Sequence, residues 1–515
     1  MRLARKRVCI VGGGAAGMAA AWSMGQHGDQ FEVEMWEKAS VPGGVATSID
    51  VGGGMFINDG VQGYTPTYRN VVNIHKSLGI THTPVEFTVS FGKDETCWNN
   101  WRERDLVARL RPEIKRFGDV LKWIQRMEPL SVLWPISLVL NVTGFPEEFG
   151  DLMVYPLVAL FFGTGNQTPR ISSAVVARVF LDPDLRLFHY CPERLLNMKP
   201  RMFAFDNLEE VYSKMAKSCG DNVKVLCNKT VSRVVRSSDL VYVYEEGSEN
   251  PTEYDEIILA CDAETSLRIL EKPTYWERKC LGNVEYYDDV TFTHEDRDYM
   301  HKYYDVDINT DQYFVRTDPQ DRKKIEMSFN LSNYQPQLKH KPNDRNIFQT
   351  IFLDKRDRAI WTEQDISKDK ILCEKWWRQM THTWRHFASV PPLVRFIQGT
   401  KHTWYCGSWT LANTHEVATI SGLTVAHRLG AEYPFTTDEF ACKQFDFYIE
   451  AIHGTTRTPR SCCSRFGSKL WFGAKVFGAS IVGLLLLPFA LLALLGVFLK
   501  GRVLRSRATQ RLRHR

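Results

Sequence analysis

A glycine cluster near the N-terminus carries the first recognisable chemistry of this sequence. Gly12, Gly14 and Gly17 form a G-x-G-x-x-G motif that follows the apolar run 8–11 and opens a helical pattern. In that order the glycines permit a tight turn, a close approach of a pyrophosphate, and packing of the helix on the strand. The first N–H groups of the helix, around Ala16, then face an anion with a partial positive charge. The motif predicts dinucleotide binding.

An acidic residue stands at the distance that such a motif requires. A second apolar-rich strand, FEVEMWE, ends at Glu37, twenty residues after Gly17. A carboxylate at this place can accept hydrogen bonds from the two ribose hydroxyls. Lys38 follows directly and is included in the predicted cofactor site. The order of strand, glycine loop, helix, strand and acid predicts a Rossmann-type site rather than an unrelated glycine-rich turn.

Three further segments have the composition of turns and helix starts. Gly43-Gly44 lie six and seven residues beyond the acid, and Asp59-Gly60 about fifteen residues further on. Much later, the strand-like residues 404–406 are followed by Gly407-Ser408 and by a helical segment that begins near His415. A strand, a turn and a helix in this order usually place free N–H groups at a helix N-terminus, where they bind an anion.

These segments resemble the signature of the flavin-containing amine oxidase and phytoene desaturase superfamily. Its pattern has an acid, a GG turn, a D-x-G segment, and a late strand, turn and helix of the form E-x-A-x-x-S/A-G around one FAD. The resemblance implies a strand at 255–260 beneath the cofactor, whose apolar run also indicates a buried parallel strand. Val45 stands where the superfamily often has arginine. The FAD contacts that the resemblance implies are Gly44, Val45, Val231 (through a nearby backbone amide against the adenine), Gly407, Ser408, Glu416 and Val417.

The middle of the chain is similar to one branch of this superfamily. Residues 153–165, 288–300 and 327–336 resemble predicted NAD/FAD-binding flavoproteins that occur with cyclopropane-fatty-acid synthases. The resemblance covers about residues 5–435 and implies an apolar, acyl-lipid type of substrate. We expect the FAD to be bound non-covalently, because Cys406 precedes the glycine that would contact the pyrophosphate.

No residue is identified as catalytic from the sequence. Flavin chemistry needs a substrate bond positioned near the reactive nitrogen and little else from the protein. His415, beside the expected flavin contact, is the best single candidate, and a helix-capping role is equally open. His382 and His386 are spaced i, i+4 without a third ligand, so we expect no metal site. The electron acceptor is left open.

The C-terminal end differs from the rest of the 515-residue chain. Residues 476–499 contain no charged residue, and a helix of that length spans about 36 Å, enough to cross a hydrocarbon core of about 30 Å. The last sixteen residues carry seven Lys or Arg and no acid. Nucleic-acid binding is one interpretation of such a tail. The apolar segment before it favours a single-pass membrane anchor and no nucleic acid, with a buried helix or a monotopic anchor as alternatives.

The expected fold is α/β, with a Rossmann-like FAD-binding domain of the GR2 type built from discontinuous segments and an α+β substrate domain. The twelve cysteines form no C-x-x-C pair and no signal peptide is evident, so we expect a cytosolic catalytic body on an unspecified organelle membrane. The predicted parts are an FAD-binding domain at 1–80, 200–270 and 396–435, a substrate domain at 81–199 and 271–395, a linker at 436–475, a transmembrane helix at 476–499, and a basic tail at 500–515.

The expected function is that of a membrane-anchored FAD-dependent oxidoreductase. It would transfer hydride from an apolar, acyl-lipid type of substrate to the flavin N5. Three alternatives remain open: a flavin amine oxidase, a redox-neutral flavin double-bond isomerase, and a non-catalytic FAD-binding scaffold.

Overall fold

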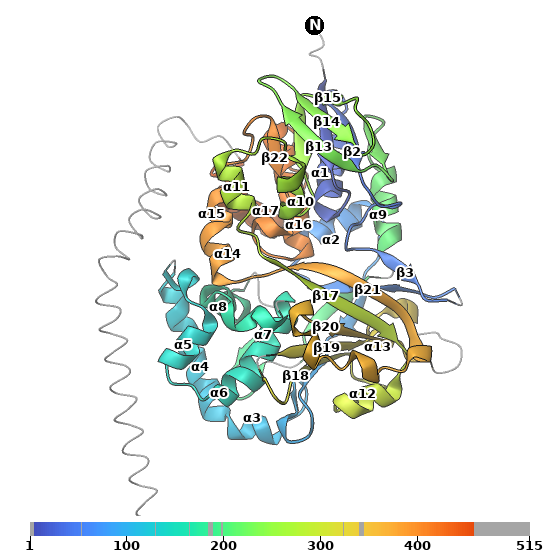
Figure 1. Cartoon of the computed structure of the whole chain (residues 1–515). Helices are drawn as coiled ribbons and strands as arrows, with labels where there is room; N and C mark the ends of the chain where they lie inside the picture. Colours follow the sequence, from blue (N-terminus) through green and yellow to red (C-terminus); the bar gives the residue numbers. More distant parts are fainter. Residues whose placement is uncertain are drawn as a thin grey trace, which may run out of the picture.

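The computed structural model describes residues 5–457, apart from 53, 129, 164, 184–188, 197–198, 206, 323 and 339–344. The chain forms two bodies, one above the other in Figure 1, each built around a sheet of its own. The predicted transmembrane helix, the basic tail and residues 458–475 of the linker lie outside the described residues, so the membrane anchor stays a prediction. Within the described part of the chain no helix is long and apolar enough to cross a membrane.

A five-stranded parallel sheet forms the centre of the upper body. Its strand order is β12-β2-β1-β16-β22, and every neighbouring pair is parallel. A parallel sheet covered on both faces needs near-continuous apolar strands, and the apolar runs of β1 and β16 meet this need. The α/β class with a Rossmann-like sheet and the parallel strand expected at 255–260 are confirmed. The strands are β1 (Lys6–Val11), β2 (Phe31–Trp36), β12 (Val223–Leu226), β16 (Glu256–Leu259) and β22 (Thr403–Tyr405).

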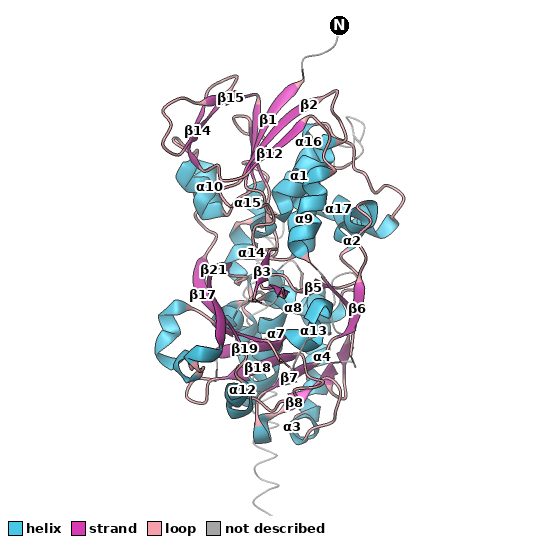
Figure 2. Ribbon diagram, turned by 90° about the vertical axis from the view of Figure 1, so that its right-hand side faces the viewer, coloured by secondary structure: helices cyan, strands magenta, loops and turns pink. Residues whose placement is uncertain are grey.

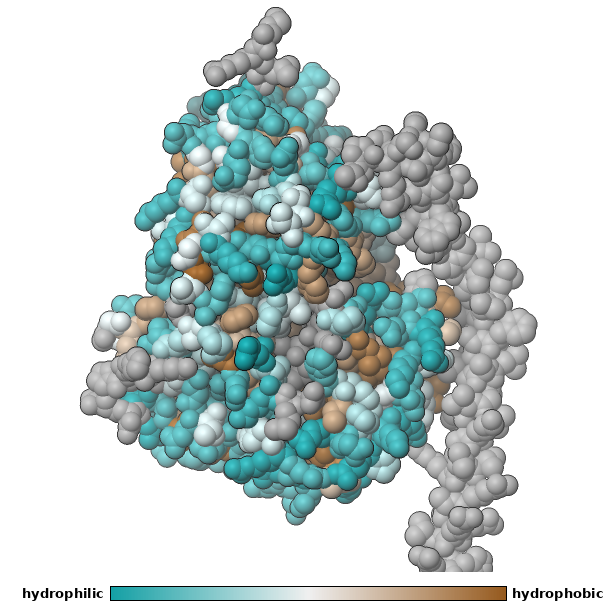
Figure 3. Space-filling model, turned by 180° about the vertical axis from the view of Figure 1, so that it is seen from behind, coloured by the Kyte–Doolittle hydropathy of each residue, from teal (hydrophilic) through white to brown (hydrophobic). Residues whose placement is uncertain are grey.

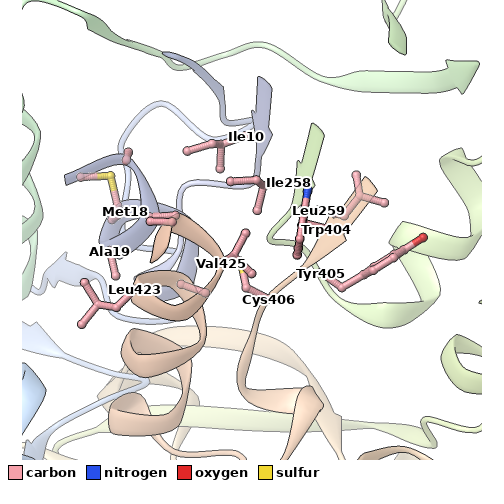
Figure 4. Packing of buried hydrophobic residues seen from close by; sticks show 14 of the residues in the cluster. Ile10, Met18, Ala19, Ile258, Leu259, Trp404, Tyr405, Cys406, Leu423 and Val425 are labelled. Atoms are coloured by element: carbon pink, nitrogen blue, oxygen red, sulfur yellow. The ribbon is translucent and has the colours of Figure 1, made fainter. Parts of the chain in front are cut away.

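Two helices from opposite ends of the chain pack side by side against this sheet. They are α1 (Ala15–Gly25) and α16 (His415–Leu429). Gly422 permits the close contact, because a Cβ at this position would overlap the carbonyl oxygen of Ala16. The side chains of both helices interlock with Ile10, Ile258 and Cys406 of the sheet region (Figure 4). The flanking helices are α2 (Arg69–Ser77), α9 (Leu208–Lys217) and α17 (Glu439–Tyr448).

A small antiparallel sheet lies at the top of the upper body in Figure 1. It consists of β13 (Val231–Arg236), β14 (Val241–Glu245) and β15 (Thr252–Tyr254). The chain then enters β16 of the parallel sheet and continues into α10 (Ala263–Ile269) and α11 (Tyr275–Leu281). The two-stranded hairpin β3 (Ser48–Asp50) and β4 (Phe56–Asn58) follows the GG turn.

The lower body contains a seven-stranded mixed sheet in the order β21-β17-β20-β19-β18-β7-β8. Its two longest strands, β17 (Tyr286–His294) and β21 (Ile371–Met380), rise toward the upper body (Figures 1 and 2). The other strands are β7 (Val89–Phe91), β8 (Trp98–Asn99), β18 (Tyr313–Thr317), β19 (Ile325–Asn330) and β20 (Phe348–Phe352).

The two faces of this sheet pack into separate cores, because alternate side chains of a strand point to opposite faces. One face packs on the helical region and forms a large apolar core that includes Val315 and Met327. The other face carries Val290 and Phe292 into a small core with α12 (Arg297–Tyr303). The helices of the large core are α3 (Asp105–Arg109), α4 (Arg111–Arg126), α5 (Ile136–Val142), α6 (Glu147–Phe149), α7 (Tyr155–Phe162) and α8 (Ser173–Leu181).

The surface is mostly hydrophilic when seen from behind. On that face the hydrophobic residues are concentrated around the level at which the two bodies meet (Figure 3). The remaining helices near this level are α14 (Trp384–Ser389) and α15 (Pro391–Val394), which lead from β21 back to β22.

Candidate cofactor and substrate site

The glycine loop joins β1 to α1 at the carboxyl edge of the parallel sheet. Gly12 has a φ of +105°, and a Cβ at Gly17 would overlap the carbonyl oxygen of Gly12, so both positions require glycine. Gly14 is different, because a Cβ there would meet only the Cα of Gly44, at 3.9 Å. No side chain caps the N-terminus of α1. The first N–H groups of α1, at Ala15 and Ala16, therefore suit an anionic ligand above Gly14.

Glu37 is held beside this loop at the end of β2. Its side chain is buried, with one carboxylate oxygen accepting the N–H of Gly13 at 2.6 Å and the other accepting the N–H of Ala39 at 2.8 Å. Each carboxylate oxygen has lone pairs for a further hydrogen bond. The side chain is thus fixed in place and keeps acceptor capacity for a ribose. Lys38 is exposed next to it.

The GG turn docks directly on the glycine loop. The N–H of Gly43 donates to the carbonyl of Gly13 at 2.8 Å, and Gly14 and Gly43 form an isolated β-bridge. Gly43 and Gly44 have φ values of +132° and +63°, which side chains rarely adopt. Val45 follows and is 59% exposed. The turn therefore brings Gly44 and Val45 next to the place where the glycine loop would bind phosphate.

The strand that begins at Val231 is attached to the segment after Glu37. The N–H of Lys229 donates to the carbonyl of Glu37, and the N–H of Asn228 donates to the carbonyl of Ala39, both at 2.9 Å. Val231 itself is buried at the start of β13. The structure thus brings Val231 to the edge of the sheet at which Glu37 lies.

The late turn is fixed by the start of α16. Gly407 has a φ of +141°, and its N–H donates to the Ser421 hydroxyl at 2.8 Å. The Ser408 hydroxyl donates to the side-chain oxygen of Asn413 at 2.9 Å. Ser421 and Gly422 of the helix motif therefore have separate structural roles, one fixing the turn and the other allowing α16 to lie against α1.

Two buried histidines support the loop between this turn and α16. The ring Nε2 of His382 accepts the N–H of Asn413 at 2.7 Å, and the ring of His386 lies 3.3 Å from the carbonyl oxygen of Leu411. Burial lowers the pKa of His382 to about 3 and that of His386 to about 4. Both imidazoles are therefore neutral at physiological pH and position the loop that carries the late turn.

At the start of α16, the Glu416 carboxylate and the Val417 N–H already have partners. The Glu416 carboxylate accepts the N–H groups of Asn70 at 2.8 Å and Val71 at 3.0 Å, at the N-terminus of α2. The N–H of Val417 donates to the Thr414 hydroxyl at 3.1 Å. Glu416 thus links α16 to α2, and the contacts of both residues with FAD stay a prediction.

His415 also has a protein partner. Its Nε2 lies 2.7 Å from the hydroxyl oxygen of Tyr212 on α9, and burial lowers its pKa to about 4. With Ala15 and His75 it lines a small cavity between α1, α2, α9 and α16. The neutral His415 ring therefore lies close to the N-terminus of α1, and a catalytic role for it stays a prediction.

The two bodies meet at Asp59-Gly60, which the resemblance placed near the flavin. A Cβ at Gly60 would overlap the carbonyl oxygen of Val45 and lie 2.9 Å from the Trp377 ring. Lys375 Nζ lies 3.1 Å from an Asp59 carboxylate oxygen and 4.2 Å from the centroid of the Trp377 ring. The indole N–H of Trp377 donates to Thr291 at 3.0 Å. Lys375, Trp377 and Thr291 thus extend the candidate site into the seven-stranded sheet of the lower body.

Neither Lys375 nor Trp377 was predicted from the sequence as a site residue. Both lie in the ten-residue strand β21, and the Lys375 and Trp377 side chains share a face because they are two residues apart. The alternation of side chains along this strand could be recognised from the sequence. The partner of Lys375, Asp59, lies more than 300 residues earlier and could not be recognised in this way. Only the paired strands of the folded chain bring these groups together.

Comparisons with known proteins agree with this geometry. A model of the NAD(P)-binding Rossmann-like domain matches residues 10–78. Among solved structures, a fatty acid isomerase from P. acnes that produces conjugated linoleic acid (CLA) aligns at 16% identity with a TM-score of 0.58, over 82% of this chain and 98% of that chain. Cyclohexylamine oxidase from Brevibacterium oxydans aligns at 14% identity with a TM-score of 0.57, over 83% of this chain and all of that chain. A putrescine oxidase variant aligns at 14% identity with a TM-score of 0.57, over 82% of this chain and 98% of that chain.

The chain has the fold of the flavin amine oxidases. Comparison with curated protein sequences gives no significant match. In this fold, the glycine loop, Glu37 and the GG turn come from the first part of the chain and the Gly407-Ser408 turn from a distant later part, and all lie along one edge of one sheet.

Proposed function

We propose that the protein is a FAD-dependent oxidoreductase. The observation that supports this best is the arrangement of the glycine loop, Glu37, Gly43-Gly44 and Gly407-Ser408 at the carboxyl edge of the parallel sheet, which is where open α/β sheets bind ligands. The residues present fit a dinucleotide. The uncapped N-terminus of α1 suits a pyrophosphate, the space above Gly14 is free of side chains, and Glu37 suits a ribose.

The protein's own groups would bind the cofactor and position the substrate. When bound, FAD would supply a flavin nitrogen, N5, that takes up hydride from a substrate carbon. The first N–H groups of α1 would hold the phosphates, and Glu37 would fix the ribose. Lys375 and Trp377, at the junction of the two bodies, would orient the reacting group of the substrate beside Asp59-Gly60.

The proposed substrate is apolar, of the acyl-lipid type. The substrate sheet packs on a large apolar core, and the sheet face that carries Lys375 and Trp377 is the one that carries Val315 and Met327 into that core. The apolar segment 476–499 would anchor the chain in a membrane, with the catalytic body in the cytosol, and so give access to such a substrate.

Three alternatives are compatible with the same fold. A redox-neutral double-bond isomerase is favoured by the structural likeness to the fatty acid isomerase. A flavin amine oxidase is favoured by the likeness to cyclohexylamine and putrescine oxidases, although Val45 stands in place of the superfamily's usual arginine. The non-catalytic FAD-binding scaffold would share the cofactor site and lack turnover.

The test begins with the purified full chain in detergent. We expect it to be yellow, with a flavin spectrum and FAD released on denaturation; a colourless protein that takes up no FAD would refute the proposal. Anaerobic bleaching by fractionated lipids and not by amines supports the oxidoreductase on an apolar substrate. Bleaching by amines supports the amine oxidase. Double-bond migration without net bleaching supports the isomerase, and flavin reduced by dithionite alone supports the scaffold.

A further inference from the structure

Three exposed aromatic side chains form a patch on the flank of the upper body. Tyr275 and Trp276 begin α11, and Phe396 follows α15; they are 58%, 47% and 55% exposed. The Trp276 and Phe396 rings stack with centroids 5.6 Å apart, and the Tyr275 ring meets Trp276 edge-on at 5.2 Å. We call these three residues the aromatic patch. Large apolar side chains that gather on a surface usually mark an interaction site.

The charged groups beside the aromatic patch are mainly basic. Helix α11 exposes Arg278 and Lys279. Just before it, Lys272 and Glu271 are both exposed, and the Glu271 carboxylate pairs with Arg233. The single acid of this helix, Glu277, is fully buried, where it pairs with Arg236 and accepts the Tyr405 hydroxyl at 2.7 Å. The exposed charged residues of α11 are therefore all cationic.

The described chain passes beside Arg395, the neighbour of Phe396, a few residues before it ends. Arg395 donates to the carbonyl of Ala451 at 2.9 Å, in the short helix η11 (Ile449–His453). The same guanidinium lies 4.0 Å from the position of a Cβ on Gly454. Arg457, three residues after Gly454, is the last described residue, and its guanidinium lies 3.1 Å from an Asp446 carboxylate oxygen on α17.

The sequence beyond Arg457 is basic and then apolar. Residues 458–475 contain four Lys or Arg and no acid, and residues 476–499 contain no charge at all. Eighteen residues extend at most about 60 Å, so an anchor at 476–499 keeps the body near a membrane without fixing its orientation.

From these four observations we propose that the aromatic patch docks on the surface of a lipid bilayer. Trp and Tyr side chains favour the boundary between headgroups and acyl chains, because an apolar ring can be buried there while its polar atom stays wet. Lys272, Arg278 and Lys279 would lie toward anionic headgroups. Helix α5, which contains the 47% exposed Leu138, lies on the same side of the molecule as α11 and α15 in Figure 1. This inference rests on the proposed membrane anchor.

The test uses the full chain in vesicles of phosphatidylcholine and phosphatidylserine. A photoreactive benzoylphenylalanine replaces Trp276 in one variant, Phe396 in a second and Trp376 in a third. Trp376 is the matched control, since it is a 40% exposed tryptophan that packs near Trp361 on the substrate sheet. After irradiation, mass spectrometry identifies what each position has captured.

We expect lipid adducts at 276 and 396 that exceed those at 376 several-fold and that decrease when phosphatidylserine is omitted. Equal lipid capture at all three positions overturns the proposal. Capture of a second copy, or of residues 458–475 of the same chain, also overturns it, because protein then covers the patch. Flotation of the same vesicles tests the anchor separately, and the flavin absorbance of the same sample tests the proposed enzyme function.

Discussion

Among single residues, the glycines of the glycine loop have two different roles. Gly17 is needed for folding, whereas Gly14 is needed for cofactor binding. Gly17→Ala places a methyl group against the carbonyl oxygen of Gly12, and Gly14→Ala places one in free space next to the helix N-terminus. We expect Gly17→Ala to lower the free energy of unfolding by about 1–3 kcal/mol, as overpacked sites do. We expect Gly14→Ala to leave it nearly unchanged and to weaken FAD binding. Urea unfolding and flavin titration of both variants measure this.

Each of these two variants has an outcome that would contradict the assigned role of its glycine. If Gly14→Ala retains FAD as tightly as the original chain, the pyrophosphate does not lie above Gly14 and the site is misplaced. If Gly17→Ala is as stable as the original chain, α1 can shift away from the loop at no cost.

Residue roles could be predicted where the reason for a residue is local. The spacing of Gly12, Gly14, Gly17 and Glu37 contains its own physical explanation, and the structure places all four at one loop. Glu416 shows the limit of this reasoning. Its position in the E-x-A-x-x-S-G pattern predicts a cofactor contact, and that contact stays a prediction. The hydrogen bonds of its carboxylate to the N-terminus of α2 are a further role that no local pattern could reveal.

Among the helices, the contact of α16 with α2 through Glu416 makes the stability of the fold depend on pH. Burial raises its pKa from the ordinary 4.5 to about 7. Between these values the unfolded chain has lost the proton and the folded chain keeps it, so stability falls as pH rises through this window and is constant above it. Glu416→Gln resembles the protonated acid and removes this dependence. We expect the stability of the variant relative to the original chain to increase by about 1–3 kcal/mol from pH 4.5 to pH 7.5.

Urea unfolding of both proteins across this pH range measures the difference between them, in which other titrating groups largely cancel. A difference that stays constant with pH would show that Glu416 titrates normally and that the three N–H donors around it offset its burial.

Elements were predictable where apolar periodicity alone defines them. The strands at 8–11, 31–36 and 255–260 follow from their apolar residues, and the parallel pairing of β1 with β2 follows from the βαβ connection. The seven-stranded sheet was not predicted in any detail, because its order joins segments from residue 89 to residue 380 by mostly antiparallel pairing. The register of such pairs depends on long-range contacts that one sequence does not display.

In the molecule as a whole, the Asp59–Lys375 ion pair lies where the upper body meets the seven-stranded sheet of the lower body. The Asp59 carboxylate is 1% exposed and Lys375 is 32% exposed. Burial raises the pKa of Asp59, and the Lys375 ammonium opposes this rise. Lys375→Met would leave a buried carboxylate without its cation, so we expect a loss of about 1–3 kcal/mol in unfolding free energy. Because the pKa of Asp59 would rise further, the loss should be larger at pH 8 than at pH 5.

The double variant Asp59→Asn with Lys375→Met separates this ion pair from general damage to the site. With the carboxylate neutral, removal of the lysine no longer strands a charge, so we expect the double variant to recover most of the stability lost by Lys375→Met alone. Asp59→Asn alone should cost little, because the partly exposed ammonium of Lys375 can turn toward water. If the losses of stability in the two single variants simply add in the double variant, the ion pair contributes nothing to the junction of the two bodies. The close packing of Gly60 against Trp377 would then hold the bodies together.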